Sequence, residues 1–210
     1  AFHIDADRKS SLEAGATMVI IGLQHGIGGL LCVPAVLGLW PDDLSLVQSL
    51  VCHGALVEAG WELQDSAVRA YEIMYGGESG RKKNPPSLCI IMAMHHVMGQ
   101  CMVIPMNLYF RENAHYHEFV FLLQAAASIA ILLQQYGYSQ DVRTEDGLRK
   151  VKASVAIVFA VMFYSRGVRF VYLAYQLFGA IREEGSTALL VLGCLSLGTM
   201  SVFNVLFLTD

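Results

Sequence analysis

The sequence predicts an all-α, polytopic membrane helix bundle with about six transmembrane helices, and three observations support this prediction. Of the 210 residues, 55% are hydrophobic and only 15% are charged, whereas a soluble domain carries roughly 25% charged residues. The mean hydropathy is +0.48, and the chain contains several apolar runs of the roughly 20 residues that a membrane-spanning helix needs. Lysine and arginine are also distributed unequally between the two sides of the expected bundle.

The apolar runs define the expected helices in chain order. They cover about 12–39, 43–75, 86–109, 116–137, 150–180 and 186–208. The runs must be helical because lipid offers the backbone no hydrogen-bond partner, and they are too long and too continuous for barrel strands. Glycine, proline and aspartate fill the breaks between them, as expected of turns. We therefore expect a short polar segment at 1–11 and one transmembrane domain over 12–210.

The basic residues give an independent test of the number of helices. With six helices, one side of the membrane holds both termini and the loops at 76–85 and 138–149. Nine basic residues then lie on that side: Arg8, Lys9, Arg81, Lys82, Lys83, Arg143, Arg149, Lys150 and Lys152. Only two, Arg111 and Arg182, lie on the other. Because such residues collect on the cytoplasmic side, the count favours six helices with both termini on the positive side.

The second expected helix contains Glu58, Glu62, Asp65 and Arg69. At 100° per residue these side chains lie within an arc of roughly 60°. Ionisable groups inside a membrane are costly and mark candidate functional sites. In one interpretation they form one side of a polar cavity. In the other, Asp65 and Arg69 pair at i,i+4 near a helix end that leaves the bilayer. The sequence favours neither.

Four more ionisable residues fall inside the expected spans. His95 and His96 lie in the third helix, about 14 Å from its start at a rise of 1.5 Å per residue. They point about 100° apart, so we expect them to line a cavity or to pack, and we expect no metal site. His25 lies beside Gly26 in a glycine-rich stretch that favours close helix packing. Arg166, near the far end of the fifth helix, either reaches the headgroups or pairs with an anionic lipid or a buried carboxylate.

These residues, in this order, resemble the TLC-domain membrane proteins, a family that includes the ceramide synthases. The likeness runs from about residue 14 to the end and rests on four features. They are Leu23-Gln24-His25, the acidic residues from Glu62 to Asp65, His95-His96, and Phe163-Tyr164-Ser165-Arg166. The resemblance implies a lipid-related function, with His95, His96, Glu58, Glu62, Asp65 and Arg166 lining the lipid cavity.

The resemblance fails at a second motif of the catalytic members. There the histidine pair works with a His-Asp-x-x-Asp-type motif in acyl transfer from acyl-CoA to an amine. Here Gln124 stands at the histidine position, and Ala125 and Ser128 stand at the aspartate positions. Acyl transfer to an amine needs a base, so the resemblance implies a protein that binds or senses lipid without ceramide-synthase activity. We expect no catalytic residue.

Two alternatives remain open. The first is a structural accessory subunit of a large energy-converting membrane complex, photosystem or respiratory, in which His25 could ligate chlorophyll. The second is a residual acyltransferase. The chain begins Ala-Phe-His and shows no secretory signal, which favours an organellar membrane, thylakoid or mitochondrial inner, with the endoplasmic reticulum as the other candidate. The formal charge of -4 without a polybasic face predicts no nucleic-acid partner.

Overall fold

The computed structural model describes residues 6–209, with side chains for residues 12–205, and these residues form helices and turns without a strand. The elements in chain order are α1 (Ala6–Val36), α2 (Leu44–Tyr75), α3 (Gly77–Lys83), α4 (Pro86–Tyr109), α5 (Ala114–Tyr138), α6 (Glu145–Met162), η1 (Phe163–Arg169), α7 (Phe170–Glu183) and α8 (Thr187–Thr209). The predicted all-α class is confirmed. Each expected helix is present, and α6, η1 and α7 together form the fifth.

Local chemistry explains where the helices begin and end. The Asp43 carboxylate accepts a hydrogen bond from the Leu46 amide at 3.0 Å and caps α2. The Asn113 side chain caps α5 through the amides of residues 115 and 116, and Thr144 caps α6 through Gly147 at 3.0 Å. Such caps satisfy backbone N–H groups that have no partner within the helix. Gly185, with a φ of +74°, supplies the left-handed turn before α8.

Five of the described helices are long and apolar enough to cross a membrane. They cover Leu12–Val36, Pro86–Tyr109, Ala114–Tyr138, Glu145–Glu183 and Thr187–Val205. The chain is therefore built as an integral membrane protein. Helix α2 is the exception: its 32 residues span about 48 Å, but its charged stripe lowers its hydropathy. It packs between α1 and α4.

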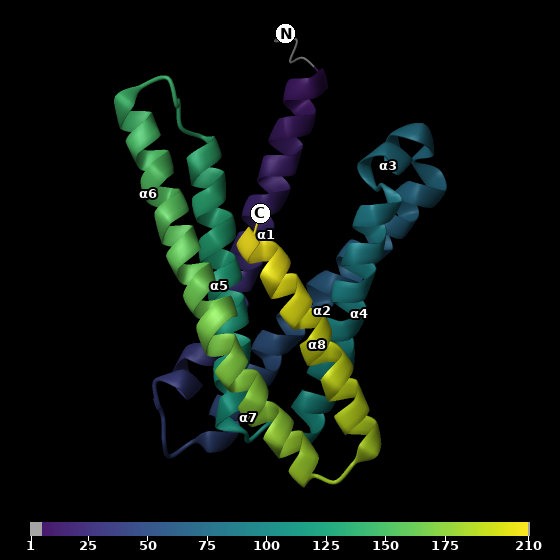
Figure 1. The fold of residues 1–210 in the computed structure, drawn as a ribbon, viewed down its shortest axis with the longest axis vertical. Helices are drawn as coiled ribbons and strands as arrows, with labels where there is room; N and C mark the ends of the chain where they lie inside the picture. Colours follow the sequence, from purple (N-terminus) through teal and green to yellow (C-terminus); the bar gives the residue numbers. More distant parts are fainter. Residues whose placement is uncertain (1–5, 210) are drawn as a thin grey trace.

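The long helices alternate in direction (Figure 1). The start of α1, α3 and the α5–α6 connection lie at one end, and the α1–α2, α4–α5 and α7–α8 connections lie at the other. This alternation groups the loops at 76–85 and 138–149 on one end, as the count of basic residues predicts. In cross-section the helices form a ring. Helix α1 packs on α5 and α2, α2 on α4, α4 on α8, α8 on η1 and α7, and α7 on α5, while α6 packs outside α5.

The apolar core occupies the lower half of the ring in Figure 1, near the α4–α5 connection. Its buried members include Cys32, Val51, Met106, Tyr116 and Leu177. On the outside, large apolar side chains stay exposed, such as Leu30 at 70% and Leu63 at 69%. An apolar outer surface of this extent is what a bilayer covers. Nearer the middle of the bundle along its length, polar side chains take the place of the apolar core.

Candidate functional site

Two carboxylates and an imidazole meet between α2 and α4. Glu58 and Glu62, one helical turn apart on α2, and His95 of α4 each place one ligand atom within 4.8 Å of the others. We call these three residues the acid–histidine cluster. Glu62 is only 2% exposed. Two negative charges separated by 4.8 Å, the upper limit of the distances between these atoms, repel by about 3.5 kcal/mol at an effective dielectric constant of ~20. The cluster therefore favours a bound proton or cation.

A glycine and a glutamine on α4 fix the position of Glu62. A Cβ at Gly99 would collide with the Glu62 carboxylate, so a larger residue there would displace this side chain from its present position. The Gln100 amide donates to Glu62 Oε2 at 3.3 Å and also to the Ala59 carbonyl. These contacts hold the carboxylate against α4. Sequence reasoning missed both residues, although a glycine and an amide side by side in an apolar helix are a detectable signal.

His25 extends the polar interior to α1. Its Nδ1 lies 2.7 Å from Glu58 Oε2 and 3.4 Å from Gln124 Oε1. Gln124, 3% exposed, donates to the Gly54 carbonyl at 2.6 Å, and Ser128 donates to the Gly22 carbonyl at 2.7 Å. His25 therefore bonds across the glycine-rich helix contact, as its sequence context indicates. Its role as a chlorophyll ligand stays a prediction.

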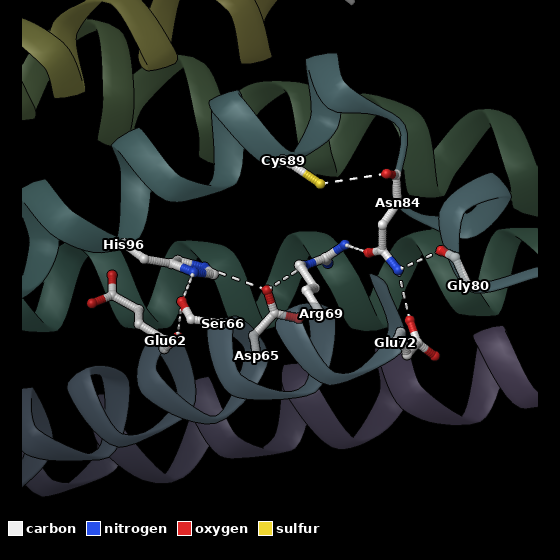
Figure 2. Close-up of polar contacts among 9 residues, drawn as sticks. All are labelled: Glu62, Asp65, Ser66, Arg69, Glu72, Gly80, Asn84, Cys89 and His96. Atoms are coloured by element: carbon white, nitrogen blue, oxygen red, sulfur yellow. Dashed lines mark hydrogen bonds and ion pairs between the residues drawn. The ribbon is translucent and has the colours of Figure 1, made fainter. Parts of the chain in front are cut away.

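A second polar group continues along α2 toward α3 (Figure 2). We call it the α2–α4 network, and its members are Asp65, Ser66, Arg69, Glu72, Asn84 and His96. Arg69 donates to Asp65 at 2.6 Å and to Asn84 at 3.0 Å, and Asn84 donates to Glu72 at 2.7 Å. His96 Nε2 lies 3.7 Å from Asp65 Oδ2, and His96 Nδ1 lies 3.0 Å from Ser66 Oγ.

Both interpretations of the α2 stripe therefore apply, to different halves of it. Asp65 and Arg69 form the i,i+4 salt bridge, while Glu58 and Glu62 meet His95 in the acid–histidine cluster. The histidine pair divides in the same way: His95 joins the cluster and His96 joins the α2–α4 network. Inside the bundle, Glu58 and Glu62 lie beside His95, and Asp65 lies beside His96.

Arg166 lies elsewhere than the sequence suggests. We predicted it near the far end of the fifth helix, but it lies midway along the continuous helix from Glu145 to Glu183, in η1. Single π-helical turns of this kind occur frequently at functional sites. Arg166 donates to the Leu123 carbonyl at 3.4 Å, and its charge lies within electrostatic range of Glu58. Among the described residues its buried Nε has no hydrogen-bond partner.

Helix α8 brings an apolar groove to the cluster. The Phe203 ring packs on the His95 ring at 5.2 Å between centroids. A groove of about 340 Å³ runs between α4 and α8 and is lined mainly by apolar side chains, among them Met94, Cys194, Leu195, Gly198, Val202 and Phe203. His95 thus belongs to the acid–histidine cluster, and its ring packs on Phe203, which lines the groove.

Asn204 is a buried polar residue that sequence reasoning missed. It is 3% exposed, and within the described part of the chain neither its side-chain nitrogen nor its oxygen has a hydrogen-bond partner. It follows Gly193 by eleven residues, about three turns, so both lie on one face of α8. Because a Cβ at Gly193 would lie 3.1 Å from Ile181 of the antiparallel α7, this register puts Asn204 opposite Phe170, where α7 follows η1.

Comparisons with protein families, with curated proteins and with solved structures give no match. The resemblance to TLC-domain proteins therefore stays a prediction that rests on the sequence features named above.

Proposed function

We propose that this integral membrane protein binds the polar end of a membrane lipid at the acid–histidine cluster and its acyl tail in the α4–α8 groove. The single observation that supports the proposal is the position of His95. Its imidazole joins Glu58 and Glu62, and its ring packs on Phe203, which lines the groove. An amphiphile needs this combination, a polar site that continues into an apolar one.

We further propose that binding occurs without acyl transfer. Gln124 and Ser128, which occupy the positions of the catalytic motif, donate hydrogen bonds to the carbonyls of Gly54 and Gly22. These side chains join helices and offer no base for an amine proton. Since a positioned acid–base group contributes about 10²–10⁴-fold in rate, we expect no ceramide synthesis. Robust product from labelled acyl-CoA and long-chain amines, abolished in His95→Ala/His96→Ala, would contradict this part of the proposal.

The binding proposal can be tested by native mass spectrometry of the purified full chain. We expect the protein to retain one lipid after extraction, and Gly198→Leu to lose it, because the added side chain fills the groove. A Cβ at Gly198 meets no atom within 4 Å, so the bundle itself should tolerate the change. Gly179→Leu is the matched control, since Gly179 of α7 is equally free of neighbours. Equal lipid retention in both variants would refute the proposal.

The alternatives predicted from the sequence concern location and partners. As a TLC-like lipid-binding protein the chain would act alone with lipid, in the endoplasmic reticulum or in an organellar membrane. As an accessory subunit of a photosystem or respiratory complex it would purify with other membrane subunits and with pigment. The exposed apolar surface suits lipid and membrane subunits equally, so native purification is the observation that separates the two.

A further inference from the structure

We infer that the acid–histidine cluster is a binding site for a divalent transition-metal cation of the Zn²⁺ class. Glu58, Glu62 and His95 each present one ligand atom, and these three atoms lie within 4.8 Å of one another. Ligands at 2.0–2.2 Å from one Zn²⁺ ion are separated by roughly 3.4 Å in a tetrahedral site. Side-chain rotations that draw the atoms together by at most about 1.4 Å therefore complete three positions of such a site.

Charge and hydrogen bonding in the cluster both favour a cation. Arg166 lies within electrostatic range of Glu58, and His25 lies 2.7 Å from the same carboxylate. Glu62, in contrast, contacts the neutral Gln100 amide. Within the part of the chain that the structure describes, His95 Nδ1 is buried without a hydrogen-bond partner. An unpaired buried nitrogen beside two carboxylates costs free energy that a metal ion would recover. This imidazole is the feature that separates the cluster from an ordinary acidic patch.

Residues around the cluster contact its carboxylates, as residues just outside a metal site contact the metal ligands. Gln100 donates to Glu62 Oε2 at 3.3 Å. His25 Nδ1 lies 2.7 Å from Glu58 Oε2, within ion-pair distance, but within the described residues this oxygen has no hydrogen-bond partner. In metal sites such contacts orient the ligating oxygen and raise affinity by about 10–100-fold. Each glutamate retains oxygen lone pairs for the ion. The cluster therefore has both a ligand set and its supporting contacts.

The ligand types indicate which ion binds. An imidazole with two carboxylates suits Zn²⁺, Mn²⁺ or Fe²⁺, whereas Mg²⁺ and Ca²⁺ prefer oxygen ligands alone. Three protein ligands leave at least one coordination position open. The α2–α4 network, with Asp65 and Glu72, provides a polar route from the α3 end of the bundle to this depth (Figure 2). This inference does not depend on lipid binding.

Metal titration of the purified full chain in lipid-free detergent tests the inference. We expect one Zn²⁺ per chain by calorimetry, little affinity for Mg²⁺, and a visible absorption band with Co²⁺ typical of nitrogen and oxygen ligands. Glu62→Gln keeps the side-chain shape and should weaken Zn²⁺ binding by at least about 100-fold, as the loss of one of three ligands requires. His53→Ala, an exposed histidine on the same helix, should bind as the unmodified chain does.

Two results would overturn the inference: no stoichiometric Zn²⁺ binding by the unmodified chain, or equal binding by Glu62→Gln and His53→Ala. If Glu62→Gln loses the helical circular dichroism of the parent, the Co²⁺ spectrum of the unmodified chain decides instead. A spectrum without nitrogen ligation would exclude His95 and refute the site. Lipid retention measured on the same preparation is a separate result, so a failed metal site and a failed lipid site can be told apart.

Discussion

Gln124 connects three helices through one amide group. From α5 it donates to the Gly54 carbonyl of α2, and its oxygen lies 3.4 Å from His25 Nδ1 of α1. Gly28 leaves room for this contact, because a Cβ there would displace the Gln124 amide from its present position. In a bilayer such interhelical hydrogen bonds contribute specificity of packing more than large free energies. Gln124 therefore fixes where α1, α2 and α5 cross, next to the acid–histidine cluster.

Replacing Gln124 by leucine tests this role. We expect Gln124→Leu to lower the free energy of unfolding by about 1 kcal/mol, since the variant keeps the side-chain volume and loses the buried hydrogen bonds. Gln134→Leu is the matched control, because Gln134 is exposed on the same helix and bonds only to the Tyr138 hydroxyl. Thermal unfolding in detergent measures both. Equal melting temperatures would mean that Gln124 does not join the helices.

At the scale of single residues, the sequence predicts only part of the candidate site. The 100° periodicity of α2 correctly groups its carboxylates on one face, because that grouping depends on one helix alone. It does not predict that Glu58 and Glu62 meet His95 while Asp65 meets His96, since this depends on the rotation of α4. The expectation of no metal site rests on the angle between the two histidines, whereas the metal site that we infer combines His95 with Glu58 and Glu62 of another helix.

At the scale of helices, glycine determines how closely α1 approaches α2. A Cβ at Gly54 would lie 2.6 Å from the Gly28 carbonyl oxygen and 2.9 Å from Cys32 Sγ. The first of these atoms belongs to the backbone, so it cannot move away without shifting α1. Small residues at a membrane helix crossing permit this approach. The spacing between the two helices in turn sets the His25–Glu58 contact.

Gly54→Ala should therefore destabilise the protein by about 1–3 kcal/mol, the usual cost of overpacking a contact. Gly60→Ala on the same helix should be neutral or stabilising by up to about 1 kcal/mol, because alanine favours helix over glycine and no atom lies within 4 Å of the added Cβ. Unfolding in mixed detergent compares the two variants. A Gly54→Ala protein as stable as Gly60→Ala would contradict the close crossing.

The helices themselves were largely predictable, because long apolar runs and their turn residues are local features. The π-helical segment η1 was not, since the sequence Phe163–Arg169 contains no glycine-proline break and reads as ordinary helix. Its extra residue per turn depends on packing against α8 and α5. The prediction that Arg166 lies near the helix end was wrong for a simpler reason, since position 166 is close to the midpoint of both the expected helix at 150–180 and the observed helix Glu145–Glu183.

At the scale of the whole molecule, the account depends on α2 crossing the membrane. The other long helices qualify by length and composition, but α2 carries the acid–histidine cluster and most of the α2–α4 network. Packed between α1 and α4, it turns Glu62 and Asp65 into the bundle, where they are 2% and 8% exposed. This burial allows a charged helix to span, because ionisable groups facing lipid would cost at least ~2.5 kcal/mol each at the bilayer centre.

Cysteine labelling at the two ends of α2 tests this claim most directly. Asp42→Cys and Ser79→Cys lie in exposed positions just before and just after the helix, and Glu145→Cys marks the loop expected on the side of Ser79. The unmodified chain reports the background from its own cysteines. With a membrane-impermeant maleimide on sealed vesicles, we expect Ser79→Cys and Glu145→Cys to label from one side and Asp42→Cys from the opposite side. Labelling of Asp42→Cys and Ser79→Cys from the same side would show that α2 does not cross, and would contradict a polar site inside the membrane.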